Sequence, residues 1–207
     1  MHIVDGALSA PVVVGGAIVA AAGIGLGLKR LSMEKIPAAG VLSATFFVAS
    51  LIHVPIGPSS VHLIMNGLAG LVLGWAAFPA LFVGLLLQAV FFGFGGLLVL
   101  GVNTVNIALP AVIVHYACRR GVASGSPNRA ALWGAVGGGV AIALTTGLVA
   151  LSLALTGDEF LPAAQLVFFA HVPVMAVEAV LSGAAVLLAR RVKPELFDAL
   201  FPEVGHA

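Results

Sequence analysis

The chain has 207 residues, of which 61% are hydrophobic and 8% are charged, and its mean hydropathy is +1.18. Soluble domains carry about 25% charged residues, so the composition excludes an ordinary water-soluble domain. Nine Lys and Arg nearly balance eight Asp and Glu, and Cys118 is the single cysteine. These counts exclude nucleic-acid binding as a main role, and they exclude a disulfide scaffold. Because 26 glycines and many alanines are typical of closely packed transmembrane helices, the composition predicts an all-α polytopic membrane protein.

Apolar stretches divide the chain into seven predicted transmembrane helices, because each span needs about 20 apolar residues. We expect one transmembrane domain over residues 1–207, with spans at about 11–28, 36–56, 60–74, 76–96, 102–118, 130–155 and 163–189. The third span is short and follows Gly57-Pro58. A short, interrupted segment of this kind is typical of a transporter's substrate site.

Basic residues follow the first, fifth and seventh predicted spans. They are Lys29, Arg30, Lys35, Arg119, Arg120, Arg129, Arg190, Arg191 and Lys193. An N-terminus outside and a C-terminus inside place all nine in the cytoplasm, which is the arrangement that membrane insertion favours. The first ten residues carry no positive region ahead of the apolar run. We therefore expect no cleaved signal peptide and a mature chain that begins with Met1-His2 on the outer face.

Known catalytic and nucleotide-binding motifs are missing from the sequence. It contains no GxxxxGK[ST], no HExxH and no GxSxG. We expect a protein that is not an enzyme and has no cofactor, and any ATP that it uses must be hydrolysed by another subunit.

Four histidines are predicted to lie in the outer half of the membrane, namely His2, His53, His62 and His171. Histidine is the commonest metal ligand, so their gathering on one side favours a metal site. The alternative is that each is a hydrogen-bonded residue near a helix end.

His2 offers a particular chelate. The α-amine of Met1, the amide nitrogen of His2 and its imidazole Nδ1 can bind one ion in a plane, which leaves the fourth position for another imidazole. The amine titrates near ~7.7–8.0, so a metal can displace its proton at neutral pH. Tetragonal nitrogen sites suit Ni(II) or Cu(II), and low-spin Co(II) fits as well.

Other polar residues are predicted to support this site. On a helix that starts near Ser60, His62 shares a face with Asn66, so Ser60 or Asn66 could orient its imidazole. His171 and Glu178 share a face of the last span, where Glu178 is a network partner or, alternatively, part of an ion relay.

Two further polar residues lie near the ends of predicted spans. Asn103 presents an amide to the bundle interior, where interhelical bonding is an equally good explanation. Asp5, next to Gly6, would let the N-terminal segment turn inward, with its carboxylate accepting backbone or imidazole N–H bonds.

Four segments together resemble one known family. They read MHIVDG, GPSSVHLIMNGLAGLVLG, FGFGGLLVLGVNTVNIAL and HVPVMAVEAVLSG…RRVKPELF. In this order and spacing they are similar to the cobalt- and nickel-specific S components of energy-coupling-factor transporters. Two positions depart from the family pattern: Ala179 stands where glycine is usual, and the turn before the third span reads Pro58-Ser59-Ser60.

The resemblance implies a metal-capture subunit of the bacterial cytoplasmic (inner) membrane, with seven helices and an N-terminal segment plugged into the bundle. It implies Met1, His2 and His62 as ligands, and it places His53 and His171 outside the ligand set. The implied partners are a transmembrane coupling subunit, a pair of cytoplasmic ATPases and often a small two-span accessory subunit.

The sequence is compatible with more than one transported ion and with more than one class of function. A planar nitrogen field favours nickel. Nickel members often carry a fused C-terminal region that does not follow the last span here, so we expect cobalt, with nickel as the alternative. A proton-coupled secondary permease that uses His171 and Glu178 without an ATPase is the rival function. An intramembrane enzyme is the third, and no motif supports it.

Overall fold

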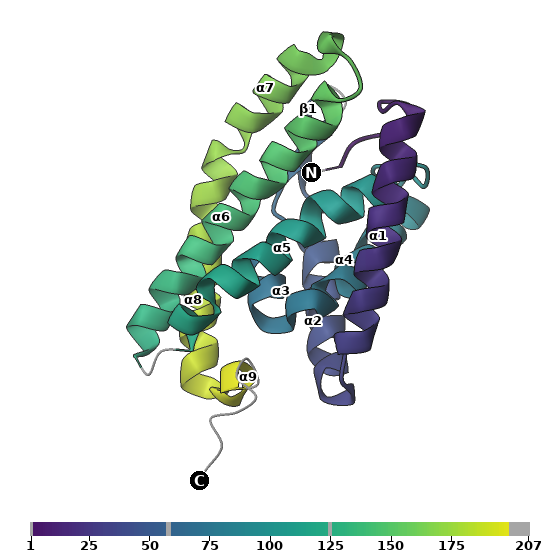
Figure 1. Ribbon diagram of the computed structural model, residues 1–207. Helices are drawn as coiled ribbons and strands as arrows, with labels where there is room; N and C mark the ends of the chain where they lie inside the picture. Colours follow the sequence, from purple (N-terminus) through teal and green to yellow (C-terminus); the bar gives the residue numbers. More distant parts are fainter. Residues whose placement is uncertain (1, 57–58, 124–125, 199–207) are drawn as a thin grey trace.

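The computed structural model describes residues 2–56, 59–123 and 126–198 (Figure 1). Most of these residues are helical, and one short antiparallel hairpin interrupts the helices. The elements in chain order are α1 (Ala10–Arg30), η1 (Met33–Lys35), α2 (Ile36–Ala49), β1 (His53–Ile56), β2 (Ser59–His62), α3 (Asn66–Leu73), η2 (Gly74–Ala76), α4 (Ala77–Phe92), α5 (Leu100–Val122), α6 (Pro127–Ala154), η3 (Asp158–Phe160), α7 (Leu161–Ala170), α8 (Val172–Val192) and α9 (Glu195–Asp198).

Five helical segments are long and apolar enough to cross a membrane. In the described part of the chain they are Ala10–Arg30, Asn66–Phe92, Leu100–Val122, Pro127–Ala154 and Asp158–Val192. The structure therefore confirms a helical, polytopic membrane protein. The seven-span count and the sidedness of the termini stay predictions, and α2, with 14 residues, is shorter than a typical span.

The helix ends follow from simple rules of capping. Proline stands in the first turn of α1, α2, α6, α7 and α8, where its missing N–H has no helical partner to lose. The last turns of α1, α5 and α8 carry Lys or Arg, which interact favourably with the negative end of a helix.

α5 lies at the centre of the bundle, where it packs against α1, α3, α4 and α6, while α6 runs along α8 (Figure 1). The contact between α3 and α5 is close enough to require glycine. A Cβ on Gly70 would overlap the backbone of Ala111. The short helix α3 is thereby buried among the longer helices, and its first residue, Asn66, is fully buried.

The hairpin corrects two expected helix boundaries within the helical fold. Residues 36–56 and 60–74 were expected to be helical, but α2 ends at Ala49 and α3 begins at Asn66. Between them β1 pairs with β2, with His53 opposite His62. Pro55 disfavours helical backbone at the residue before it, which favours extended structure here. Residues 57–58 lie outside the described residues.

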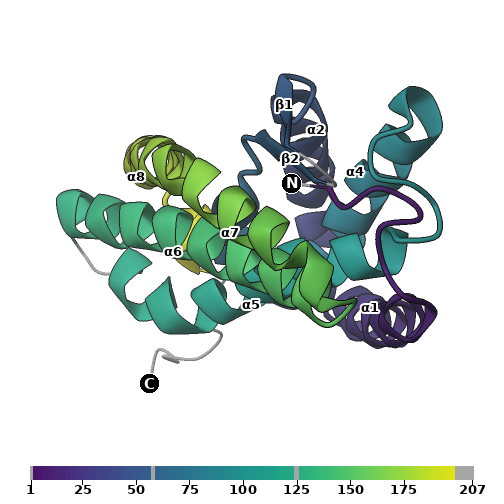
Figure 2. The same cartoon turned by 90° about the horizontal axis from the view of Figure 1, so that it is seen from above.

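The last predicted span, 163–189, is divided at His171 into α7 and α8. Pro173 explains the break, because it lacks the N–H that a continuous helix would need at this point. The break leaves His171 at the start of α8, on the side where the hairpin lies against α7. Figure 2 shows the N-terminal segment passing beside this hairpin before it enters α1.

Candidate metal centre

The rings of His2 and His62 meet inside the protein. Nδ1 of His2 lies 3.1 Å from Nε2 of His62, and the ring centroids are 4.7 Å apart. Both side chains are only 3% exposed. Both residues lie outside the five helical segments that could span a membrane, and burial lowers the pKa of each imidazole to about 4. The two imidazoles are therefore neutral at pH 7, which is the form that binds a metal ion.

The neighbours of His62 determine which of its nitrogens carries the proton. Nδ1 lies 2.7 Å from the carbonyl oxygen of Leu63. A carbonyl oxygen only accepts, so Nδ1 must donate its N–H. In a neutral ring Nε2 then has a free lone pair, and this lone pair faces His2.

The same reasoning applies to His2. Its Nε2 lies 2.6 Å from Oε1 of Gln88, whose amide nitrogen donates to the Ser50 hydroxyl. With this orientation of the Gln88 amide, Nε2 of His2 carries the proton and Nδ1 carries a lone pair. Two lone pairs face each other at 3.1 Å, an arrangement that repels unless a cation lies between them.

The separation of the two nitrogens suits one bound ion. Imidazole nitrogens bind transition metals at about 2.0–2.1 Å, so two of them at a right angle lie about 2.9 Å apart. The observed 3.1 Å needs only a small adjustment to reach that value. This pair can therefore supply two neighbouring ligands of a single transition-metal ion.

The N-terminal segment, residues 2–9, is held by side chains from other elements. The Asn103 amide accepts from the Ile3 N–H and donates to the Ile3 carbonyl, both at 3.0 Å. Oδ1 of Asp5 accepts the N–H groups of Leu98 and Val99, both at 3.1 Å. These contacts fix the backbone on both sides of residue 3 and bring His2 into the bundle.

A glycine makes room for the Asp5 carboxylate. Gly96 has a φ of +143°, which L side chains rarely adopt, and a Cβ there would overlap the Asp5 carboxylate. The prediction that Asp5 accepts backbone N–H groups is confirmed.

The segment that carries His62 is held from a different direction. Residues 59–65, which we call the hairpin segment, continue from β2 to the start of α3. Oε1 of Glu178, on α8, accepts the N–H groups of Ile64 and Met65 at 2.5 and 2.8 Å. Met65 has a left-handed backbone with a φ of 57°. The predicted network role of Glu178 is therefore one of binding this backbone.

Several predicted supporting residues have other roles. The prediction that Ser60 or Asn66 orients His62 is wrong, because the Leu63 carbonyl occupies Nδ1 and the Asn66 amide donates to Ile107 and Thr145. The reason is that the helix begins at residue 66, so Asn66 is not one turn from His62 on a shared helix.

His53 and His171 flank the pair without binding it. His53 is partly exposed, and its ring lies edge-on against Phe94, 4.3 Å between centroids. Nδ1 of His171 lies 2.7 Å from the Val167 carbonyl, and its buried Nε2 has no partner among the described residues. No hydrogen bond joins His171 to Glu178.

Met1, the first predicted ligand, lies outside the described residues. Within the described ranges, no group of three or more His, Cys, Asp or Glu could hold a metal ion. Gln88 and Ser50, which contact this site, were not predicted from the sequence. The signal for Gln88 was available, because it is the only polar side chain in the apolar α4 sequence AFPALFVGLLLQAVFF.

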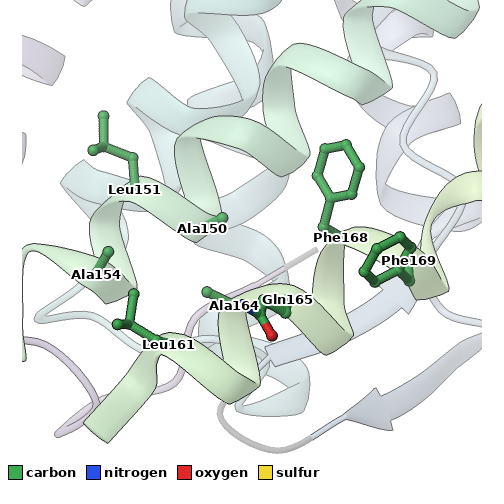
Figure 3. A pocket seen from close by; sticks show the side chains of 8 residues that line it. All are labelled: Ala150, Leu151, Ala154, Leu161, Ala164, Gln165, Phe168 and Phe169. Atoms are coloured by element: carbon green, nitrogen blue, oxygen red, sulfur yellow. The ribbon is translucent and has the colours of Figure 1, made fainter. Parts of the chain in front are cut away.

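A hollow elsewhere on the molecule lacks metal-binding chemistry (Figure 3). It lies between the end of α6 and α7, and Gln165 is its single polar lining residue. Its lining consists of Ala150, Leu151, Ala154, Leu161, Ala164, Gln165, Phe168 and Phe169. None of these side chains is a typical transition-metal ligand, so the paired imidazoles are the stronger candidate site.

The long apolar helices define an integral membrane protein, and the buried imidazole pair is a candidate site for a transition-metal ion. Residues 2–196 match the model of the family described as the cobalt uptake substrate-specific transmembrane region. The chain belongs to this family.

Several similar proteins are named as transport proteins or transporters, in agreement with this family assignment. A Haemophilus influenzae protein named for metal transport is 42% identical over 96% of this chain and 97% of its own length. The fused nickel transport protein NikMN of Rhodobacter capsulatus is 37% identical over 51% of this chain, which matches 32% of that protein. A crystal structure titled as a transition metal transporter superimposes with a TM-score of 0.75, at 28% identity, over 99% of this chain and 100% of that one.

Proposed function

We propose that the chain is the substrate-specificity subunit of an ATP-driven metal importer of the energy-coupling-factor type. It captures Co(II) from the outer side, with Ni(II) as the alternative cargo. The observation that carries the proposal is the 3.1 Å approach of two bare imidazole nitrogens, Nδ1 of His2 and Nε2 of His62.

The proposed ligand set has four nitrogens. The Met1 amine, the His2 amide nitrogen and His2 Nδ1 close a planar chelate, and His62 Nε2 completes the plane next to His2 Nδ1. A planar nitrogen set favours nickel, whereas the family description refers to cobalt uptake. Soft or tetragonal ions fit such a site, and Ca²⁺ and Mg²⁺, which prefer oxygen, do not.

The proposed orientation has seven spans, with the N-terminus outside and the C-terminus in the cytoplasm of a bacterial cell. It is supported by the gathering of the basic residues at one end of the bundle, where α1 and α8 end and α6 begins (Figure 1). Positive charge is retained on the cytoplasmic side during membrane insertion.

The proposed partners are a transmembrane coupling subunit, a pair of cytoplasmic ATPases and a small two-span accessory subunit. The absence of a GxxxxGK[ST] motif from this sequence supports the need for a separate ATPase. Release of the ion requires His2 and His62 to separate, which would follow if the subunit tilts and the N-terminal segment withdraws.

A secondary permease that uses His171 and Glu178 is the rival function. The contacts of Glu178 argue against it, because one carboxylate oxygen is already occupied by two backbone N–H groups. Metal uptake into vesicles that contain only this chain would favour the permease. Uptake that requires the ATPases and their hydrolysis of ATP would favour the importer.

Metal titration of the purified chain tests the capture site. We would compare the chain with its native N-terminus, a version extended by one residue before Met1, and His62→Ala, and follow visible absorption with Co(II) and with Ni(II). The proposal expects tight binding only by the native chain and a large loss of affinity in both variants, and the ion that the native chain prefers identifies the cargo. Unchanged binding by the extended chain would show that the amine is not a ligand.

A further inference from the structure

Glu178 is a fully buried carboxylate in a membrane-spanning helix, and its two oxygens differ in their contacts. Oε1 accepts two consecutive backbone N–H groups, from Ile64 and Met65, and Oε2 has no partner among the described residues. These N–H groups lie just before the first turn of α3. Glu178 therefore anchors the backbone that leads into α3, from another helix, 114 residues further along the chain than Ile64.

One peptide group connects this carboxylate to His62. The N–H of Ile64 and the carbonyl of Leu63 belong to the same planar peptide unit. The N–H donates to Glu178 at 2.5 Å, and the carbonyl at the other side accepts from His62 Nδ1 at 2.7 Å. Fixing one side of a rigid plane fixes the other, so the direction of the Leu63 carbonyl depends on Glu178.

We propose that Glu178 is a positioning residue for His62, acting through the Leu63–Ile64 peptide group to hold the imidazole with Nδ1 protonated and Nε2 bare towards His2. Metal-binding histidines commonly donate their second N–H to a carboxylate or a carbonyl, which fixes the tautomer and the ring orientation. Here the carbonyl accepts the N–H and the carboxylate orients the carbonyl. The proposal rests on the proposed metal-capture function.

The backbone of the hairpin segment explains why an external anchor is needed. Met65 has a left-handed conformation that costs free energy for a non-glycine residue, and it persists only where the surroundings enforce it. Oε1 of Glu178 accepts from the Met65 N–H as well as from that of Ile64, so one oxygen holds both sides of the turn. Without this anchor the peptide plane could rotate, and the Leu63 carbonyl would leave His62.

Two conservative substitutions of Glu178 test the proposal, because it predicts which of them lowers metal affinity more. Glu178→Gln keeps an oxygen at the same reach, whereas Glu178→Asp keeps the charge but is shorter by about 1.5 Å. In titrations of the full chain with Ni(II), Glu178→Gln should change affinity by less than about threefold. Glu178→Asp should lower affinity by about 10–100-fold, the usual effect of losing a residue that supports a metal ligand.

Ser182→Ala is the matched control, because Ser182 is also fully buried on α8, one turn further on, and its hydroxyl has no partner among the described residues. Its affinity should stay within about twofold of the unchanged chain. If Glu178→Asp keeps its affinity and Glu178→Gln loses it, the charge matters rather than the reach, and the proposal is overturned.

A double-mutant cycle separates positioning from a general structural effect. In a His62→Ala background, Glu178→Asp should have no further effect on the residual Ni(II) affinity, because the side chain through which it acts is gone. An equal loss in both backgrounds would overturn the proposal.

The tautomer of His62 can be read without any metal. Imidazole ¹⁵N shifts should show a protonated Nδ1 in the unchanged chain and in Glu178→Gln, and a mixture of tautomers in Glu178→Asp. If that pattern appears but the unchanged chain binds neither Ni(II) nor Co(II), the proposed function fails and the positioning role stands. If metal binds and the tautomer is the same in all three chains, the positioning role fails and the proposed function stands.

Discussion

The two segments that carry the imidazoles have similar backbone structure and burial, but they are hydrogen-bonded to different helices. The N-terminal segment and the hairpin segment are both non-helical, and their histidines are equally buried. The N-terminal segment is held by Gln88 on α4 and Asn103 on α5, whereas the hairpin segment is held by Glu178 on α8. The two halves of the candidate site therefore depend on different helices.

This difference suggests how a buried ion could be both held and released. α6 lies between α5 and α8 and packs against both. A shift of α8 relative to α5 would move His62 with its peptide anchor and leave His2 in place. The site would then open without the unfolding of either segment.

Removal of His62 should have the largest effect on metal binding. His62→Ala deletes one of the four proposed ligands, so Ni(II) affinity should fall by more than about 100-fold, beyond the 10–100-fold loss typical of supporting residues. The control is His53→Ala, which removes the opposite residue of the same hairpin and should change affinity by less than about threefold. Isothermal titration of both chains measures the difference, and equal losses would place the site elsewhere.

Release of the N-terminal segment should have the next largest effect. Asn103→Leu leaves the backbone N–H and carbonyl of Ile3 without partners, at about 1–3 kcal/mol, which corresponds to about 5–150-fold in affinity. Limited proteolysis should also cut near the N-terminus sooner. Asn106→Leu is the control on the same helix, because Asn106 bonds Ser152 instead. Faster cleavage in both variants would indicate general loosening of α5.

The pH dependence of binding tests the protonation of the two imidazoles. Each has a pKa of about 4, so neither releases a proton to the metal between pH 5.5 and 7. An α-amine ordinarily has a pKa of about 7.7–8.0, so in this pH range the Met1 amine and the His2 amide must each lose one proton when the metal binds. Affinity therefore falls on acidification with a slope of about two protons per ion. Competition titrations measure this slope. A slope that rises toward four below pH 6 would mean that both imidazoles are ordinarily basic.

The smallest expected effect concerns the outer contact of the N-terminal segment. Asp5 is exposed, so the loss of its two bonds in Asp5→Ala should lower affinity by about 2–10-fold, following the usual 0.5–1.5 kcal/mol of a hydrogen bond. Asp5→Asn keeps the accepting oxygen and should stay close to the unchanged chain. If Asp5→Asn loses as much as Asp5→Ala, the carboxylate charge rather than its bonds supports the site.

The sequence predicted the features that depend on composition and on local chemistry. Long apolar stretches predicted membrane helices, and α1, α5 and α6 include the expected ranges 11–28 and 102–118 and most of 130–155. His2 and His62 were chosen for chelate chemistry and by family resemblance, and the structure brings their rings together.

The features that depend on contacts between distant residues could not be predicted. Apolar content alone does not distinguish a short apolar hairpin from a helix, so the strands before α3 were missed. Hydrogen bonds between Gln88 and His2, and between Glu178 and the Ile64 backbone, join residues 86 and 114 positions apart. No local pattern reports such pairs.

The pair of hydrogen bonds between the Asn103 amide and the Ile3 backbone sets the position of the N-terminal segment along the chain direction. Asn103 binds the N–H and the carbonyl of residue 3, as a neighbouring β-strand would, and these bonds do not depend on the side chain of residue 3. Any residue that binds Asn103 in this way places the preceding residue of the chain next to His62. Deletion of a single residue between positions 3 and 8 would keep the hydrogen bonds to Asn103 and strain the connection to α1. Insertion of a residue between His2 and Ile3 would move the histidine away from His62.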